Sequence, residues 1–182
     1  MVSNEILRKY AKLAVCTGVN VQKGQLLVIT SAVDIAYFTR MCVEEAYKAG
    51  AGEVLVNWSD EAVTKLAYQN ESTETLADIA PWKLEQKKNC IDKKCCFLYI
   101  ESNTPGLLAN IDGKKLQTVR IAMETAFEKF EYYTMANIGQ WSIVAIPTIP
   151  WAKKAFPDLD DEKALEKLWN AVLMSVRVSE SN

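Results

Sequence analysis

The chain has 182 residues, of which 49% are apolar and 24% are charged, and its formal net charge is −2. This composition supplies a core for one folded domain and excludes disordered and fibrous proteins. The dispersed charges offer no basic surface, so we expect neither nucleic acid nor a membrane as a partner. The sequence contains no histidine, which excludes Ser-His-Asp and Cys-His nucleophile schemes and removes the commonest transition-metal ligand.

The apolar runs and the cysteines of the sequence indicate the cellular compartment of the protein. No apolar run approaches the roughly 18 residues that cross a bilayer, and the first 14 residues carry charges where a signal peptide is apolar. The five cysteines are odd in number and form no CxxC pair, which favours buried, reduced thiols over disulfides or a zinc ribbon. We therefore expect a cytoplasmic protein.

The first half of the chain predicts a helix followed by a right-handed βαβ unit. Apolar residues at helical spacing from Ile6 lead to a stop at Gly18. Asp34 is placed to cap a second helix, which ends at Gly50. Together with the apolar runs on either side, this makes residues 25–56 one βαβ unit.

Four short runs are almost continuously apolar, as strands covered on both faces of a parallel sheet require. These runs are Leu26–Ile29, Val54–Val56, Cys96–Ile100 and Ile143–Ile146. Ser59 is predicted to cap a helix after the second run, and a further helix is expected to break near Pro81.

Two more helices follow in the second half. The spacing predicts one from Asp112 to about Thr134, with Leu116, Val119, Met123, Phe127 and Phe130 on one face. It predicts another over 161–176. The fold class is therefore α/β: a three-layer sandwich with a mostly parallel sheet of at least four strands and helices on both faces, Rossmann- or flavodoxin-like.

A nucleotide-binding motif is missing from this fold. The turn after the first strand is Thr30-Ser31-Ala32-Val33-Asp34 and has no glycine, although Gly-x-Gly-x-x-Gly would be needed there. Thr30 and Ser31 lie at a strand end, where open sheets bind ligands, but helix capping explains them as well. The paired acids Glu44–Glu45 and Asp60–Glu61 are interpreted as solvated or capping residues.

The segment 141–156, WSIVAIPTIPWAKKAF, joins a buried strand to two prolines, two tryptophans and two lysines. Pro147 and Pro150 fix the backbone at the strand's carboxyl end, so we expect a rigid loop there. Such a loop suits the rim of a ligand site, and a purely structural corner remains open as the alternative.

This segment, with the later AlaLeuGluLysLeuTrp at 164–169, resembles the aminopeptidase T, aminopeptidase S and PepS family of metallo-aminopeptidases. Tyr10-Ala11-Lys12-Leu13 and the stretch from Gly18 to Gln25 resemble the opening of that family. The stretch from Glu45 to Ala51 and Trp58-Ser59-Asp60-Glu61 resemble its first βαβ unit. The similarity spans nearly the whole chain.

The resemblance implies a parent enzyme that removes amino-terminal residues from peptides with two divalent metal ions, zinc, cobalt or magnesium. It places the metal ligands in a carboxy-terminal domain, so no catalytic, cofactor-binding or metal-binding residue is assigned in this chain. Residues 1–178 would form the amino-terminal α/β domain and residues 179–182 the start of a linker to the catalytic domain. The parent is expected to be a homodimer.

In this interpretation the domain walls the substrate cavity and packs against the catalytic domain. The residues expected to face the cavity or the other domain are Trp141, Pro147, Trp151, Lys153, Lys154 and Phe156. The alternative is a stand-alone module that binds a small molecule or protein through a flavodoxin-like sheet, at the strand ends near Thr30, Ser31 and Pro147.

Overall fold

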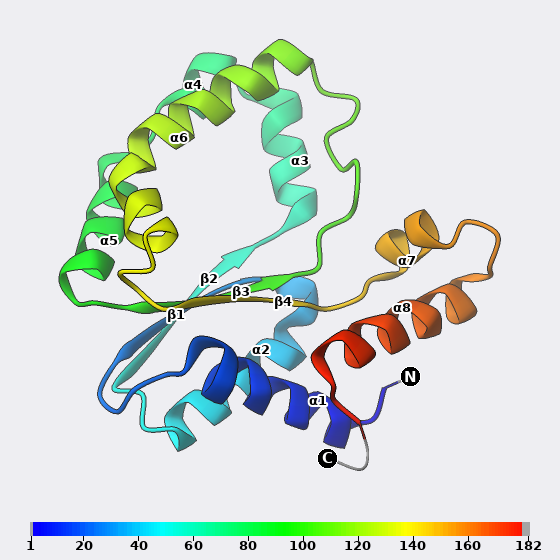
Figure 1. The fold of residues 1–182 in the computed structure, drawn as a ribbon. Helices are drawn as coiled ribbons and strands as arrows, with labels where there is room; N and C mark the ends of the chain where they lie inside the picture. Colours follow the sequence, from blue (N-terminus) through cyan, green and yellow to red (C-terminus); the bar gives the residue numbers. More distant parts are fainter. Residues whose placement is uncertain (1, 180–182) are drawn as a thin grey trace.

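The computed structural model describes residues 2–179 as one sheet with helices packed on both faces (Figure 1). Within this part of the chain, four strands lie in the order β2-β1-β3-β4, and all neighbours are parallel. The predicted three-layer α/β sandwich is therefore confirmed. The strands are β1 (Leu26–Ala32), β2 (Glu53–Ser59), β3 (Cys96–Glu101) and β4 (Trp141–Ala145).

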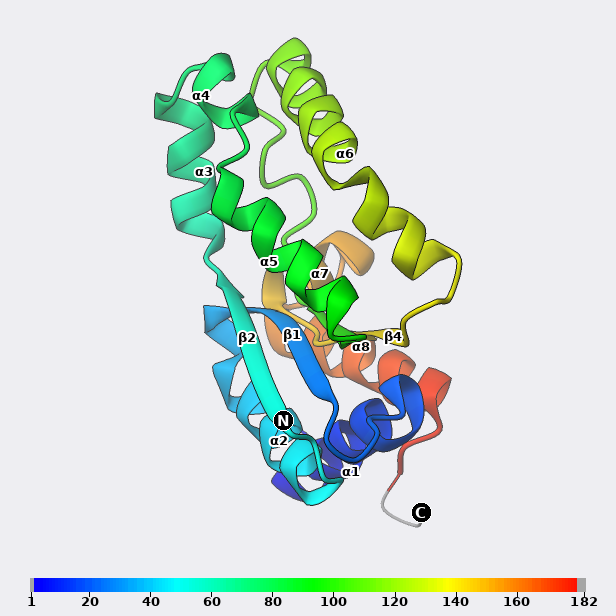
Figure 2. The ribbon, with the colours of Figure 1, turned by 90° about the vertical axis from the view of Figure 1, so that its left-hand side faces the viewer.

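The helices divide between the two faces of the sheet (Figures 1 and 2). α1, α2 and α8 cover one face, while α5 and α6 cover the other. α3 and α4 extend away from the carboxyl end of β2, and α4 packs beside α6. The α-helices are α1 (Asn4–Lys12), α2 (Ala36–Lys48), α3 (Glu61–Asn70), α4 (Thr73–Ala77), α5 (Pro81–Asp92), α6 (Gly113–Met135), α7 (Ile149–Ala155) and α8 (Asp161–Val176).

The packing on both faces of strand β1 explains why its sequence is continuously apolar. Leu27 and Ile29 belong to the core cluster that includes residues of α1 and α2, whereas Leu26 and Val28 pack with residues of α5 and α6. Successive side chains of a strand point to opposite faces, so a strand covered on both sides needs apolar residues throughout. Burial of both faces therefore explains the apolar runs.

The predicted βαβ unit is confirmed, but the first helix ends differently from the prediction. α2 stops at Lys48, and Gly50 follows with φ +95°, a conformation that favours glycine.

α1 continues as a π-helical turn over Leu13–Val19, which Asn20 closes in the left-handed conformation with φ 54°. Gly18 therefore lies inside this turn and does not end it. Asn20 can end the turn because asparagine also tolerates the left-handed region.

Asp34, Thr30 and Ser31 do not cap a helix as expected. A 3₁₀ turn precedes α2, and neither Ala32 nor Ile35, which occupy the two N-cap positions, supplies a side-chain cap. The Ser31 and Thr39 hydroxyl oxygens lie 2.7 Å apart in the core, so Ser31 joins β1 to α2 instead. The 3₁₀ turn moves Asp34 away from the capping position.

The cap of α3 is displaced by one residue from its predicted position. Ser59 is the last residue of β2, and the Asp60 carboxylate accepts the Val63 N–H at 3.1 Å. The strand runs further than its apolar residues suggest, so the capping role passes to Asp60.

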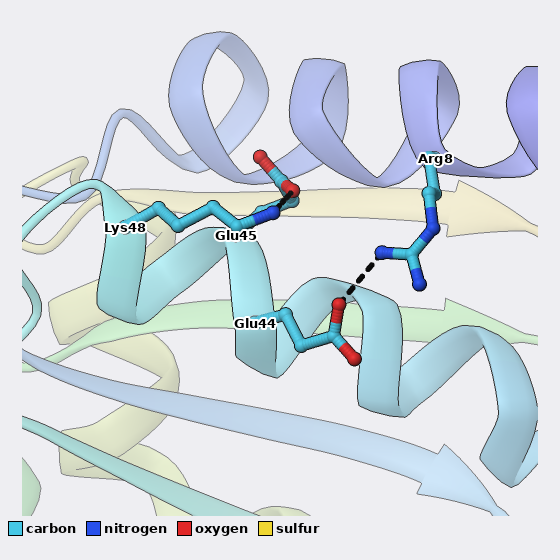
Figure 3. Close-up of polar contacts among 4 residues, drawn as sticks. All are labelled: Arg8, Glu44, Glu45 and Lys48. Atoms are coloured by element: carbon cyan, nitrogen blue, oxygen red, sulfur yellow. Dashed lines mark hydrogen bonds and ion pairs between the residues drawn. The ribbon is translucent and has the colours of Figure 1, made fainter.

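The acids Glu44 and Glu45 lie in different environments (Figure 3). Exposed Glu44 forms a 2.6 Å ion pair with Arg8 of α1, and their hydrogen bond lowers the pKa of Glu44 and raises that of Arg8. Glu45 is only 8% exposed and accepts from Lys48 Nζ at 2.6 Å. The expectation of a solvated acid is therefore wrong for Glu45.

The later helices agree closely with those predicted from the sequence. α5 begins at Pro81, α6 spans Gly113–Met135 and α8 spans Asp161–Val176. Met123 is the exception, because its side chain is 41% exposed although it was predicted on the packed face of α6. The middle of α6 lies beyond the part of the helix that packs on the sheet (Figure 1).

Candidate functional site

The carboxyl ends of the four parallel strands meet at one edge of the sheet, where β1 ends at Ala32 and β3 at Glu101. The chain passes from β1 to β2 on one side and places β3 on the other, so the strand order reverses between β1 and β3. Open α/β sheets bind ligands outside the strand ends at such a switch point.

A crevice of about 250 Å³ lies at this switch point, and we call it the strand-end crevice. Its walls come from the segments that follow β1, β2, β3 and β4. The lining residues are Ala32, Asp34, Glu61, Ser102, Thr104, Thr148, Ile149 and Pro150.

A second hollow of about 510 Å³ adjoins the strand-end crevice and shares Glu61 and Thr104 with it. It opens between α3 and the loop that follows β3. Glu61 Oε1 accepts the Thr104 N–H at 2.7 Å, which ties the start of α3 to that loop. Because Asp60 caps α3, Glu61 occupies the first helical position beside this loop. The remaining lining residues are Ser59, Thr64, Asn103, Gly106, Leu107, Leu108, Ala109 and Leu116.

The strand-end crevice is rich in hydrogen-bond acceptors and negatively charged. Asp34 and Glu61 contribute carboxylates, three residues contribute hydroxyls, and no lysine or arginine lines either hollow within the described residues. The hydroxyls have no histidine to activate them, since the sequence contains none. The crevice can therefore bind a ligand, but it lacks the parts of a nucleophilic active site.

Neither a metal site nor a membrane helix is found in the described part of the chain. Among residues 2–179, no three His, Cys, Asp or Glu side chains gather as a metal site requires. No helix in that range is long and apolar enough to cross a membrane.

The thiols are free and mostly enclosed. Cys16 is half-buried, and the other four cysteines are buried. Burial raises the pKa of Cys96 to about 12 and raises the pKa values of Cys42, Cys90 and Cys95 as well. Because the thiolate is the reactive form, these buried cysteines are poor nucleophiles.

Two aromatic residues of segment 141–156 are held by contacts inside the domain. Trp141 Nε1 donates to the Thr134 carbonyl at 3.0 Å. Phe156 packs with α7 and α8, and Lys167 Nζ lies 4.5 Å from the centre of its ring. Trp151 is half-buried in the same cluster.

The other residues predicted to face the cavity or the catalytic domain differ in exposure. Pro147 is buried, whereas Lys154 is exposed. Lys153 Nζ donates to the carbonyls of Pro157 and Leu159, which closes the turn after α7. The role of these residues at a domain boundary stays a prediction.

The expected rigid loop is instead a helix from Ile149 onward. Thr148 caps α7 by accepting the Trp151 N–H at 3.4 Å, and Pro150 lies in the first turn. Proline is well suited to that turn, because the first helical N–H groups lack intrahelical partners. Pro150 also lines the strand-end crevice, whereas Pro147 does not, and a ligand-facing rim at this segment stays a prediction.

Sequence reasoning missed four residues of the strand-end crevice. The sequence places Asp34 and Glu61 at helix starts and offers no motif around Ser102 and Thr104. The ligand-site candidates that the sequence offers, Thr30, Ser31 and Pro147, do not line it. The usable signal was the position of residues 102–104, directly after the buried run that forms β3.

Comparison with known proteins places the chain among peptidases. Residues 3–182 match peptidase family M29, described as thermophilic metalloproteases. The chain is 34% identical to aminopeptidase AmpS of Bacillus subtilis over 176 residues, which cover 97% of this chain and 43% of AmpS. It is 32% identical to aminopeptidase 2 of Geobacillus stearothermophilus, with the same coverage.

A solved structure shares the fold. AmpT from Thermus thermophilus superposes with a TM-score of 0.84 at 26% identity, over 92% of this chain and 42% of AmpT. The chain therefore spans less than half the length of these relatives. Because the family match covers nearly every residue, the chain belongs to the M29 family of metallopeptidases.

Proposed function

We propose that this chain is the amino-terminal, non-catalytic domain of a metal-dependent aminopeptidase that removes amino-terminal residues from peptides. One observation carries the proposal: the chain matches family M29 from residue 3 onward but spans only 43% of its aminopeptidase relatives. The lack of histidine, together with the lack of a metal-ligand cluster in residues 2–179, supports a catalytic centre elsewhere in the parent.

In this proposal residues 1–178 form the domain and residues 179–182 begin a linker. Val178 packs against the main core cluster, which supports a domain that reaches this residue. Residues 180–182 lie outside the described residues. The two divalent ions, zinc, cobalt or magnesium, would bind to the remaining part of the parent, where they would activate the attacking water.

The domain's role is to wall the substrate cavity and support the catalytic domain. Trp141, Pro147, Trp151, Lys153, Lys154 and Phe156 are proposed to lie nearest that domain. Exposed Lys154 and the 45% exposed Ile149 on α7 offer a surface for this contact. The parent is proposed to be a cytoplasmic homodimer, and the free cysteines support a reducing compartment.

The test compares the chain alone with a chimera. Residues 1–178 would be joined to the part of B. subtilis AmpS that this chain does not match, and release of leucine from a leucyl peptide would be measured with added cobalt or zinc. The chain alone should give no turnover, and the chimera should give metal-dependent turnover. The unmatched part of AmpS, expressed by itself, is the matched control.

Two results would contradict the proposal. One is metal-dependent release of leucine by the purified 182-residue chain that survives controls for contaminating peptidase. The other is a folded chimera that binds metal but has no more activity than the AmpS part alone.

A further inference from the structure

Ser102 lies at the strand-end crevice with a hydroxyl that the protein does not use. The residue is only 6% exposed, and its hydroxyl has no hydrogen-bond partner among residues 2–179. Within that range, no completely enclosed side-chain nitrogen or oxygen lacks a partner. The Ser102 hydroxyl must therefore reach the small accessible surface of its residue, and Ser102 lines the strand-end crevice.

Two carboxylates line the same crevice and have no cationic partner in the described part of the chain. Asp34 follows β1, and Glu61 begins α3, so they come from different elements. Neither takes part in an ion pair there. The Thr104 N–H occupies only Oε1 of Glu61, which leaves Oε2 available. A ligand here should therefore be a cation that donates hydrogen bonds.

The crevice suits an organic cation better than a metal ion. A metal would need a cluster of ligating side chains, and none is formed in residues 2–179. A primary ammonium group carries three N–H donors, which match the carboxylates of Asp34 and Glu61 and the hydroxyl of Ser102. Ile149 and Pro150 add apolar surface for an attached aliphatic group.

The size and position of the crevice agree with a small ligand. Its volume of about 250 Å³ is below the usual range for drug-sized molecules. It lies at the switch point of the sheet, where polar groups from separate strand ends converge. We propose that the strand-end crevice binds a primary ammonium group, carried by a free amino acid or by the amino terminus of a peptide.

This inference goes beyond the proposed function and depends only on the chain itself. The test is an NMR titration of the 182-residue protein with L-leucinamide, a primary ammonium compound without a carboxylate. Leucinamide should give saturable amide shifts at residues 33–35, 61 and 102–104. N-acetyl-L-leucinamide, the neutral counterpart, should give none. Leucine and leucylglycine as separate ligands then distinguish a free amino acid from a peptide terminus.

Variants at the crevice complete the experiment. Glu61→Gln keeps an oxygen that can accept the Thr104 N–H but removes the charge, so leucinamide should bind about tenfold more weakly or worse. Ser102→Ala should also weaken binding. Glu128→Gln, at an exposed position on α6 outside the crevice, should bind like the wild type. Asp34→Asn, at an exposed position, removes the other charge and should weaken binding as well, and it serves alone if Glu61→Gln does not fold.

Three results would overturn the inference: no saturable shifts with any of the amines, equal binding of N-acetyl-L-leucinamide, or wild-type affinity in both carboxylate variants. Because the titration measures binding to the chain alone, its failure leaves the result of the chimera assay unaffected. Failure of the chimera would likewise leave the titration result unchanged.

Discussion

The Tyr10 hydroxyl of α1 holds both backbone groups of Ala145 on β4. It donates to the Ala145 carbonyl at 3.2 Å and accepts from the Ala145 N–H at 3.1 Å. The Tyr10 ring packs on Phe38 of α2, with 5.3 Å between the ring centroids. One buried side chain therefore joins the first helix, the second helix and the end of the fourth strand.

Replacing Tyr10 with phenylalanine tests this connection. Tyr10→Phe keeps the ring on Phe38 but leaves two backbone groups without their partner, so stability should fall by about 1–3 kcal/mol. Urea unfolding measures the loss. The control is Tyr132→Phe at a position that is 69% exposed, where the change should be within about 0.5 kcal/mol. Equal midpoints for Tyr10→Phe and wild type would show that the hydroxyl does not hold β4.

Gly52 and Gly113 should respond in opposite ways to alanine. A Cβ on Gly52 would lie 2.6 Å from the Gly24 carbonyl oxygen, so the backbone of one turn must move. Gly52→Ala should destabilise the protein by about 1–3 kcal/mol. A Cβ on Gly113, at the start of α6, meets nothing within 4 Å. Gly113→Ala should add about 0.4–1 kcal/mol. Thermal unfolding of both variants checks the signs, and a neutral Gly52→Ala would refute the close packing of the turns.

Buried Cys96 should make the fold sensitive to alkali. Burial raises the pKa of its thiol from 9.0 to about 12, so the unfolded chain loses this proton first as the pH rises. The contribution of the thiol to stability is complete below pH 9 and falls by up to about 1.4 kcal/mol per pH unit until about pH 12. Urea unfolding from about pH 8 to about pH 11 measures this slope.

Two variants separate titration from packing in that experiment. Cys96→Ala should show a shallower alkaline decline than the wild type because the titrating group is gone. Leu98→Ala, at a buried position on the same strand, should be less stable at every pH yet decline in parallel with the wild type. An unchanged slope in Cys96→Ala would mean that this thiol does not govern the alkaline response.

Lys115 should protect the last turn of α3. Its Nζ donates to the carbonyls of Tyr68 at 2.6 Å and Glu71 at 2.5 Å, where a cation complements the helix dipole. Lys115→Met should accelerate amide hydrogen exchange at residues 67–71 about two- to fivefold. Lys114→Met, at the exposed neighbouring position, should leave these rates unchanged. Unaltered exchange in Lys115→Met would exclude the proposed C-terminal cap.

Helices and strands were predictable where a local pattern determines them. The periodicity of α8 gave its limits, Asp161 and Val176, and the β1 run showed that both faces of the sheet are covered. Cap positions were less predictable, because they depend on backbone angles at single residues. A 3₁₀ turn displaced Asp34, and a longer β2 passed the cap from Ser59 to Asp60.

The sequence by itself determined the fold class, the family and the absence of histidine chemistry, because these depend on composition, periodicity and contiguous motifs. Only the tertiary structure decided the strand order and the meeting of Asp34, Glu61 and Ser102 in one crevice. These three residues follow three different strands and are far apart in the chain. The register of a parallel sheet brings such strand ends together, and no local pattern in the sequence records that pairing.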